Sequence, residues 1–155
     1  MKQGRPKEDL FKVRILLPDG EWHRGEAEWV WAEKLGEDTA IVRNVPFFAK
    51  GLSFGDSIRF STADGVPTFS EVLSRAGHST YRIFASHGKD DPQVQGLLRT
   101  LNEHHCDIEI ANARLIAVDV LPEADIYQVF GILENAEKEG YIDFQEGHCG
   151  HQVRS

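Results

Sequence analysis

Two short clusters of histidine and cysteine hold the side chains of this 155-residue chain that are best suited to metal binding or nucleophilic chemistry. They are His104, His105 and Cys106 in the first cluster and His148, Cys149 and His151 in the second. Imidazole and thiolate are ligands that zinc prefers, and a thiolate near a histidine can also act as a nucleophile. Adjacent side chains rarely reach one ion, however, and neither cluster has the spacing of a zinc knuckle. We therefore expect no metal site, with these six residues as weak candidates, no cofactor and no catalytic residue.

A lone carboxylate, Asp119, interrupts the apolar run 115–121. Burying an unpaired carboxylate is costly, so this position predicts one of three arrangements. Asp119 could bind a partner or act as an acid or base, it could pair with Arg82 on a neighbouring strand, or the N-terminal half could cover this face of the sheet. We favour the pair with Arg82.

Other catalytic signatures do not occur in the sequence. Gly77-His78-Ser79 is not a nucleophile elbow, which needs a serine between two glycines, and neither a phosphate-binding loop nor a dinucleotide fingerprint occurs. His78 is therefore interpreted as a turn residue.

The negative charge of the chain is concentrated in its last third. Residues 1–99 carry 14 acidic and 14 basic side chains, whereas residues 100–155 carry 11 acidic and 3 basic ones, so the whole net charge of −8 lies there. Such a surface repels phosphate backbones and attracts basic proteins. We expect a basic protein partner and no nucleic acid; the alternative is that the acidic surface serves solubility alone.

The polar N-terminus and the two cysteines indicate the compartment. The first nine residues contain no apolar stretch, and no run approaches the length of a membrane span, so we expect no signal peptide and no membrane association. Two cysteines are too few for a disulfide framework. We expect a cytoplasmic protein with reduced thiols, and leave its oligomeric state open.

The sequence of the first half of the chain predicts short strands joined by turns. Apolar and polar residues alternate in segments separated by turn residues such as Pro18-Asp19-Gly20 and Ala63-Asp64-Gly65. The expected strands are 11–17, 22–33, 39–43, 56–62 and 66–73. Trp29 and Trp31 share one face of their strand, which we interpret as facing the core or the interface between subdomains rather than as a platform for a ligand. This spacing is typical of a small antiparallel barrel or a strongly curled sheet.

Residues 44–56, called the corner below, are the segment whose backbone is most constrained. Pro46 fixes its own φ, and Gly51 can take positive φ. Phe47 and Phe54 are too apolar for an ordinary solvated loop, so we expect both rings to fill a core beneath the turn.

The second half changes to a helical period. Asp91-Pro92 predicts the start of a first helix, with apolar residues at helical spacing after it, and Asp125 starts a second helix that ends at Gly140. The expected strands around these helices are 81–86, 107–111, 114–121 and 141–146. The order βαββαβ is ferredoxin-like and predicts a four-stranded sheet in the spatial order fourth, first, third, second.

The whole pattern predicts an α+β protein, in which a small antiparallel β-barrel-like N-terminal subdomain packs on a ferredoxin-like C-terminal subdomain. The expected boundaries are a polar tail over 1–10, the two subdomains over 11–78 and 79–147, and a C-terminal tail over 148–155.

Alternation along the strands of the second half divides them into two faces. The face turned away from the helices should carry the partner-binding residues, which are Glu109, Asp119, Tyr141, Asp143 and Gln145.

Three motifs carry a family resemblance. They are Glu28-Trp29-Val30-Trp31-Ala32-Glu33, Asn44-Val45-Pro46-Phe47 with its glycine turn, and Gly77-His78-Ser79-Thr80-Tyr81-Arg82. Over residues 11–85 the chain resembles an uncharacterised bacterial domain-of-unknown-function family marked by the Asn-Val-Pro-Phe motif. The resemblance implies a bacterial, cytosolic, stand-alone protein and supplies no catalytic residue.

Charge and resemblance together favour a non-catalytic acidic protein that binds a basic protein, of the immunity type that inhibits a bacterial toxin. One alternative is a small metal- or thiol-dependent enzyme at the edge where the His/Cys clusters lie. The other is a small-ligand sensor that uses the ferredoxin-like sheet.

Overall fold

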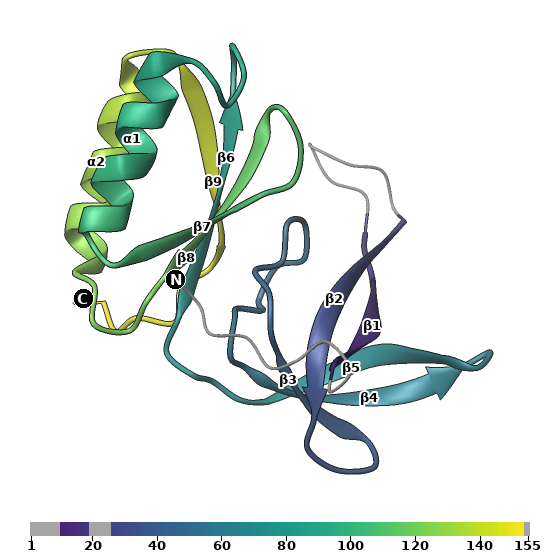
Figure 1. The fold of residues 1–155 in the computed structure, drawn as a ribbon. Helices are drawn as coiled ribbons and strands as arrows, with labels where there is room; N and C mark the ends of the chain where they lie inside the picture. Colours follow the sequence, from purple (N-terminus) through teal and green to yellow (C-terminus); the bar gives the residue numbers. More distant parts are fainter. Residues whose placement is uncertain (1–9, 19–25, 154–155) are drawn as a thin grey trace.

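The computed structural model describes residues 10–18 and 26–153 as two β-sheets and two helices. Strands β1 to β5 form one sheet, and β6 to β9 form the second, whose one face is covered by both helices (Figure 1). The protein is therefore α+β, with its strand-only half first. The predicted turn at Pro18-Asp19-Gly20 and the two ends of the chain lie largely outside the described residues.

The first sheet closes on itself. Its strands are β1 (Leu10–Leu16), β2 (Ala27–Lys34), β3 (Thr39–Val42), β4 (Ser57–Ala63) and β5 (Val66–Ser74). Neighbours in sequence pair antiparallel, and a parallel pairing of β1 with β5 at Arg14 and Thr68 closes the barrel. The Arg14 side chain reinforces this seam, because its Nη2 donates to Thr68 Oγ1 at 3.1 Å.

The interior of the barrel is filled by small and aliphatic side chains. Along β2 the buried residues are Glu28, Val30 and Ala32, while Trp29 is 47% exposed and Trp31 lies half-buried beneath the ammonium of Lys12. The two tryptophans therefore lie outside the barrel core, which leaves the interface between the two halves as the other place expected for them. Five strands enclose little space, so the alternate row of smaller side chains occupies the interior.

The second sheet has the strand order β7-β8-β6-β9, with every neighbouring pair antiparallel. Its strands are β6 (Ser79–Ala85), β7 (Cys106–Ile110), β8 (Leu115–Val120) and β9 (Ile142–His148). In chain order β6 is the first strand of this half and β9 the fourth, so the predicted spatial order is confirmed.

Two capped helices lie on one face of this sheet (Figure 1). Asp91 caps α1 (Pro92–Glu103) and Asp125 caps α2 (Ile126–Lys138), each carboxylate accepting from backbone N–H groups of the first turn. Both predicted helix starts are thereby confirmed. Within the described ranges, neither helix is long and apolar enough to cross a membrane.

The corner projects from the barrel toward the uncovered face of the second sheet (Figure 1). Its buried hydrophobic side chains include Val45, Ala49 and Leu52, and Ser53 and Asp56 are buried polar residues of the same segment. Phe47 and Phe54 are only half-buried, so the expectation that they fill the core is wrong. Phe54 packs instead against the imidazole of His78, with ring centroids 5.5 Å apart. Ala49 and Leu52 pack with the hydrophobic core of the barrel.

We predict that Leu52→Ala lowers the free energy of unfolding by about 2 to 5 kcal/mol, because it leaves a cavity at a fully buried position. Phe47→Ala should cost less, although it removes more atoms, because that ring is partly solvated. Urea unfolding of both variants tests the pair. A larger loss for Phe47→Ala would show that the aromatic ring supports the corner.

Candidate functional site

The corner is held from the barrel side by one carboxylate. Glu28 at the start of β2 is buried and accepts hydrogen bonds from three consecutive backbone N–H groups, those of Phe47, Phe48 and Ala49. Such amides have no other partner in a tight turn, and a carboxylate satisfies them more strongly than a neutral acceptor does. Glu28 therefore fixes the backbone at the tip of the corner.

The corner is held from the sheet side by one guanidinium. Arg82 on β6 is fully buried, and its Nη2 donates to the carbonyl oxygen of Ala49. Its Nε and Nη1 have no hydrogen-bond partner within the described part of the chain. Burial lowers the pKa of Arg82 to about 10, an effect that the negative charge of Glu28 opposes. The Ala49 residue thus connects a buried anion in the barrel to a buried cation in the sheet.

Gly147 on β9 makes room for this guanidinium. A Cβ atom built on Gly147 would lie 2.5 Å from Nη1 of Arg82, and the β6–β9 pairing shifts register at this point. The carbonyl oxygen of Gly147 also accepts from Gly51 N at 2.8 Å, which ties the corner to the sheet backbone. A side chain at this position would therefore require the Arg82 guanidinium to move.

Other buried polar groups complete the contact between corner and sheet. Ser53 Oγ and Thr80 Oγ1 lie 2.7 Å apart, and Asp56 accepts from the backbone N–H groups of Ser53 and Ala76 and from the Arg75 guanidinium. Each of these contacts either joins two residues of the corner or connects the corner to β6 or to the residues just before β6. We call the contacts of Glu28, Arg82, Gly147, Ser53 and Asp56 the polar network.

Of the predicted partner-binding residues, Glu109 contacts the N-terminal half and Asp119 is buried within the sheet. Both carboxylate oxygens of Glu109 on β7 accept from Val45 N at 3.2 Å. Asp119 on β8 is fully buried, and its Oδ1 lies 2.7 Å from Nδ1 of His78. Arg82 does not form the expected pair with Asp119, because among the described residues its guanidinium donates to the carbonyl oxygen of Ala49 instead. The corner covers the middle of this sheet face, as one of the three interpretations of Asp119 anticipated.

The other three predicted partner-binding residues lie on or beside β9. Asp143 is exposed, while Gln145 and Tyr141 are half-buried. Burial raises the pKa of Tyr141, an effect to which Glu139 and Asp91 add. Asp143 is therefore the member of the predicted set that is most open to a partner.

Leu121 connects the two His/Cys clusters. Its N–H donates to the carbonyl oxygen of His105 at 3.0 Å, and its own carbonyl lies 2.8 Å from Nε2 of His151. The Nδ1 atom of the same imidazole lies 2.6 Å from Ser79 Oγ. Among the described residues no group of three or more His, Cys, Asp or Glu side chains is placed to hold a metal ion.

The two cysteines differ in their surroundings. Cys106 is buried, which raises the pKa of its thiol to about 12, and Asp119 and Asp107 add to this effect. Cys149 is half-buried, with Sγ 3.5 Å from the carbonyl oxygen of His151. Cys106 stays a neutral thiol at physiological pH and is unsuited to act as a nucleophile.

An acidic and aromatic surface lies where α2 meets β9. The Phe130 and Phe144 rings make an edge contact with centroids 5.7 Å apart, and Glu137 Oε2 accepts from Phe144 N at 3.2 Å. Tyr127 and Phe130 are 45% and 43% exposed. We define the α2–β9 surface as these two rings with the acidic side chains Glu134, Glu137 and Glu146, and with Asp143, which alternation places on the other face of the same edge strand.

Sequence reasoning missed Glu28, His78 and the role of Arg82. A usable signal existed for Glu28, because alternation places it in the same inward row as Val30 and Ala32. Arg82 gave a similar signal between Tyr81 and Ile83 in a buried strand. No signal pointed to the corner as the partner of either charge, because these contacts join residues distant in sequence.

We predict that Gly147→Ala destabilises the protein by about 1 to 3 kcal/mol, because the new methyl group overlaps the buried guanidinium of Arg82. Gly131→Ala in α2 is the matched control, since a Cβ there meets nothing within 4 Å and alanine favours a helix. Thermal unfolding compares the two. Equal stability of both variants would mean that Arg82 readily moves away from Gly147.

We also predict that iodoacetamide alkylates Cys149 in the native protein at mildly alkaline pH but leaves Cys106 unmodified. The raised pKa and the burial of Cys106 act together, since both reduce the accessible thiolate. Peptide mass spectrometry measures each site, and unfolding in denaturant should make both reactive. Rapid native alkylation of Cys106 would contradict its place in the core.

Comparison with known proteins places the chain in a family. No curated protein matches it. A solved structure, described as "Novel crystal structure of a hypothetical protein from Neisseria gonorrhoeae", is similar with a TM-score of 0.79 and 19% identity, covering 91% of this chain and 96% of that one. That likeness shows a shared fold. The sequence model of the family described as Domain of unknown function (DUF4265) matches residues 28–144, which reaches from β2 into β9. The chain therefore belongs to the DUF4265 family.

Proposed function

We propose that this protein is a non-catalytic binding module whose α2–β9 surface takes a basic protein partner. The observation that carries the proposal is the combination of two exposed aromatic rings, Tyr127 and Phe130, with acidic side chains on the same helix and the adjoining strand. Aromatic residues supply contact area at interfaces, and surrounding charge selects the partner and speeds association.

The charge of this region is one-sided. Residues 122–148 carry seven acidic side chains and one lysine, Lys138. In the barrel, by contrast, several carboxylates are neutralised locally, as where Arg59 contacts both Asp38 and Glu71 and where Arg43 contacts Glu33. An unbalanced patch creates a field that reaches beyond its own side chains, whereas paired charges cancel within a few ångströms.

The proposal relies on Asp143 among the residues first expected to bind the partner. Glu109 already accepts from Val45, and Asp119 is enclosed, so neither is open to direct contact. Both have a structural part in the proposal, since they help to hold the sheet whose outer strand and helix form the binding surface.

The fold supports this assignment. We propose to class the first half as a small β-barrel and the second as ferredoxin-like, which the βαββαβ order and the strand order β7-β8-β6-β9 support. In such a sheet the face opposite the helices is often the binding face. Here the corner lies on that face, which leaves the α2 side and the β9 edge for a partner.

A narrower form of the proposal is an immunity-type inhibitor of a toxin that acts on nucleic acid. A site that binds phosphate backbones must be basic. The α2–β9 surface is complementary to such a site in charge, and it could block the site by occupying it. The proposal makes the protein bacterial and cytoplasmic, the setting in which such an inhibitor acts.

The test is association kinetics with a partner first identified by crosslinking and then purified. Reversing Asp143 and Glu146 to lysine should slow association about tenfold or more at low ionic strength, with little effect at high salt, where charges are screened. Thermal stability should hardly change, because exposed charges contribute less than about 1 kcal/mol.

The control reverses two exposed barrel carboxylates, Glu26 and Glu37, and so makes the same change in net charge. It should leave most of the association rate intact. If the two double variants slow association equally, only net charge matters and the α2–β9 surface is not the binding site. The narrower form fails if the purified partner has no activity on nucleic acid.

A further inference from the structure

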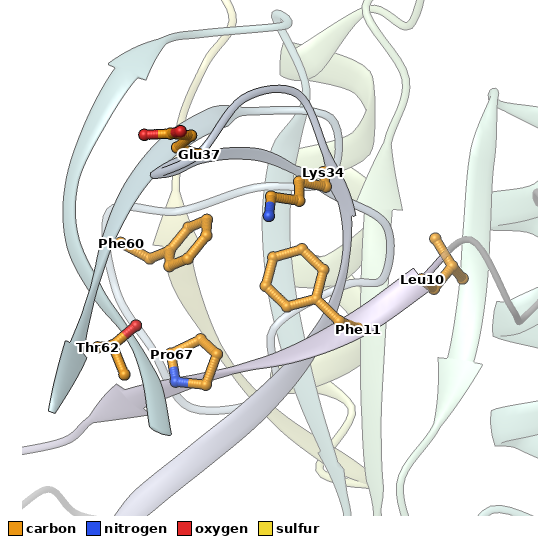
Figure 2. Close-up of a pocket in the computed structure, with 7 residues that line it drawn as sticks. All are labelled: Leu10, Phe11, Lys34, Glu37, Phe60, Thr62 and Pro67. Atoms are coloured by element: carbon orange, nitrogen blue, oxygen red, sulfur yellow. The ribbon is translucent and has the colours of Figure 1, made fainter. Parts of the chain in front are cut away.

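The end of the barrel that lies away from the polar network is open. Glu28, which holds the corner, begins the inward-facing row of β2, and Lys34 lies at the other end of the same strand. Around Lys34 the structure contains a pocket of about 460 Å³. Figure 2 shows the side chains that line it, which come from β1, β2, β4, β5 and the turn after β2. The pocket therefore lies at the end of the barrel opposite the corner.

The residues of this pocket continue the inward-facing rows of the barrel. Phe11 precedes the buried Val13 in the row on β1, and Lys34 follows the buried Ala32 in the row on β2. The pocket is thus the unfilled end of the barrel interior. Pockets of this size accommodate small organic ligands, and barrel mouths are a common place for them.

The floor of the pocket is aromatic. The Phe11 and Phe60 rings pack with centroids 5.2 Å apart and planes inclined by 60°. Pro67 adds the flat face of its ring (Figure 2). A planar apolar group fits against such surfaces, because stacked or edge contacts between rings add to the gain from removing apolar area from water.

The ammonium group of Lys34 lies above the aromatic floor of the pocket. In Figure 2 the ammonium of Lys34 points toward the two phenyl rings, while the Glu37 carboxylate points away from it at the rim. The ammonium makes no hydrogen bond or ion pair with any other described residue. An exposed lysine that ends an inward-facing row above apolar rings, with no ion pair to another described residue, is suited to receive an anion.

The charges favour a monoanion. One lysine can neutralise one negative charge, and Glu37 at the rim repels a second. A carboxylate therefore matches the pocket better than a doubly charged phosphate. Thr62 at the wall supplies a hydroxyl that can donate to the same group.

We propose that this barrel-mouth pocket binds a small aromatic carboxylate, whose ring packs on Phe11 and Phe60 and whose carboxylate pairs with Lys34. The site is independent of the α2–β9 surface, since it lies on the barrel and shares no residue with that surface. It makes the protein a ligand-binding module as well as a protein-binding one.

The experiment uses cinnamate as the probe and cinnamyl alcohol as its neutral analogue, with binding measured by protein-observed NMR on the full chain. We expect cinnamate to shift the resonances of Phe11, Lys34 and Phe60, and to bind more tightly than the alcohol. Lys34→Gln should weaken cinnamate binding about tenfold or more, the value of one charge-assisted contact, and leave the affinity for the alcohol unchanged.

The matched control is Lys12→Gln, which removes the same charge from the neighbouring strand, where the ammonium lies 5.1 Å from the Trp31 ring centroid. It should leave cinnamate binding unchanged. Phe11→Ala should weaken both compounds alike, and thermal unfolding of each variant confirms that it is folded. Absence of saturable cinnamate binding, shifts elsewhere on the protein, or equal weakening by Lys34→Gln and Lys12→Gln would each overturn the proposal.

Discussion

The structure depends on the way two buried charges share one short segment of backbone. Glu28 in the barrel accepts from the N–H of Ala49, and Arg82 in the sheet donates to the carbonyl of the same residue. Each charge would be very costly to bury alone, and the polar backbone of the corner lowers that cost for both. The backbone of the corner therefore connects the two charges and stabilises both. The small residues Ala49 and Gly147 allow this backbone to come close to the Arg82 guanidinium.

Local patterns in the sequence were sufficient to predict most of the fold. The caps Asp91 and Asp125, the helical spacing after each, and the strand order of the second sheet follow from interactions between residues near in sequence or from general rules of topology. The direction in which the tryptophan side chains point could not be predicted in this way. Alternation shows that a strand has two rows of side chains, but it does not show which row a narrow barrel can enclose. The fate of Phe47 and Phe54 likewise depended on how closely the corner approaches the sheet.

The candidate site was harder to predict because its chemistry lies in contacts between distant residues. Val45 meets Glu109 across 64 positions, and His78 meets Asp119 across 41. A charged residue in an apolar strand shows that a partner exists, yet any of several opposite charges could supply it. Surface properties were more accessible, because the acidic character of the last third depends only on composition. The pocket at the barrel mouth required both kinds of information: alternation for its walls and the closed sheet for its shape.

The crossing of the corner from barrel to sheet also limits how this protein can be divided. A cut between Ser74, which ends β5, and Ser79, which begins β6, would separate two sheets that share no strand. The barrel piece would then lose the sheet contacts of the corner and keep the carboxylate of Glu28, while the sheet piece would keep the guanidinium of Arg82 without the backbone that receives it. Although each half has its own hydrophobic core, these shared contacts lead us to expect that the two unfold together. Exchange of halves between relatives would succeed only where the corner and the glycine beneath it were exchanged together.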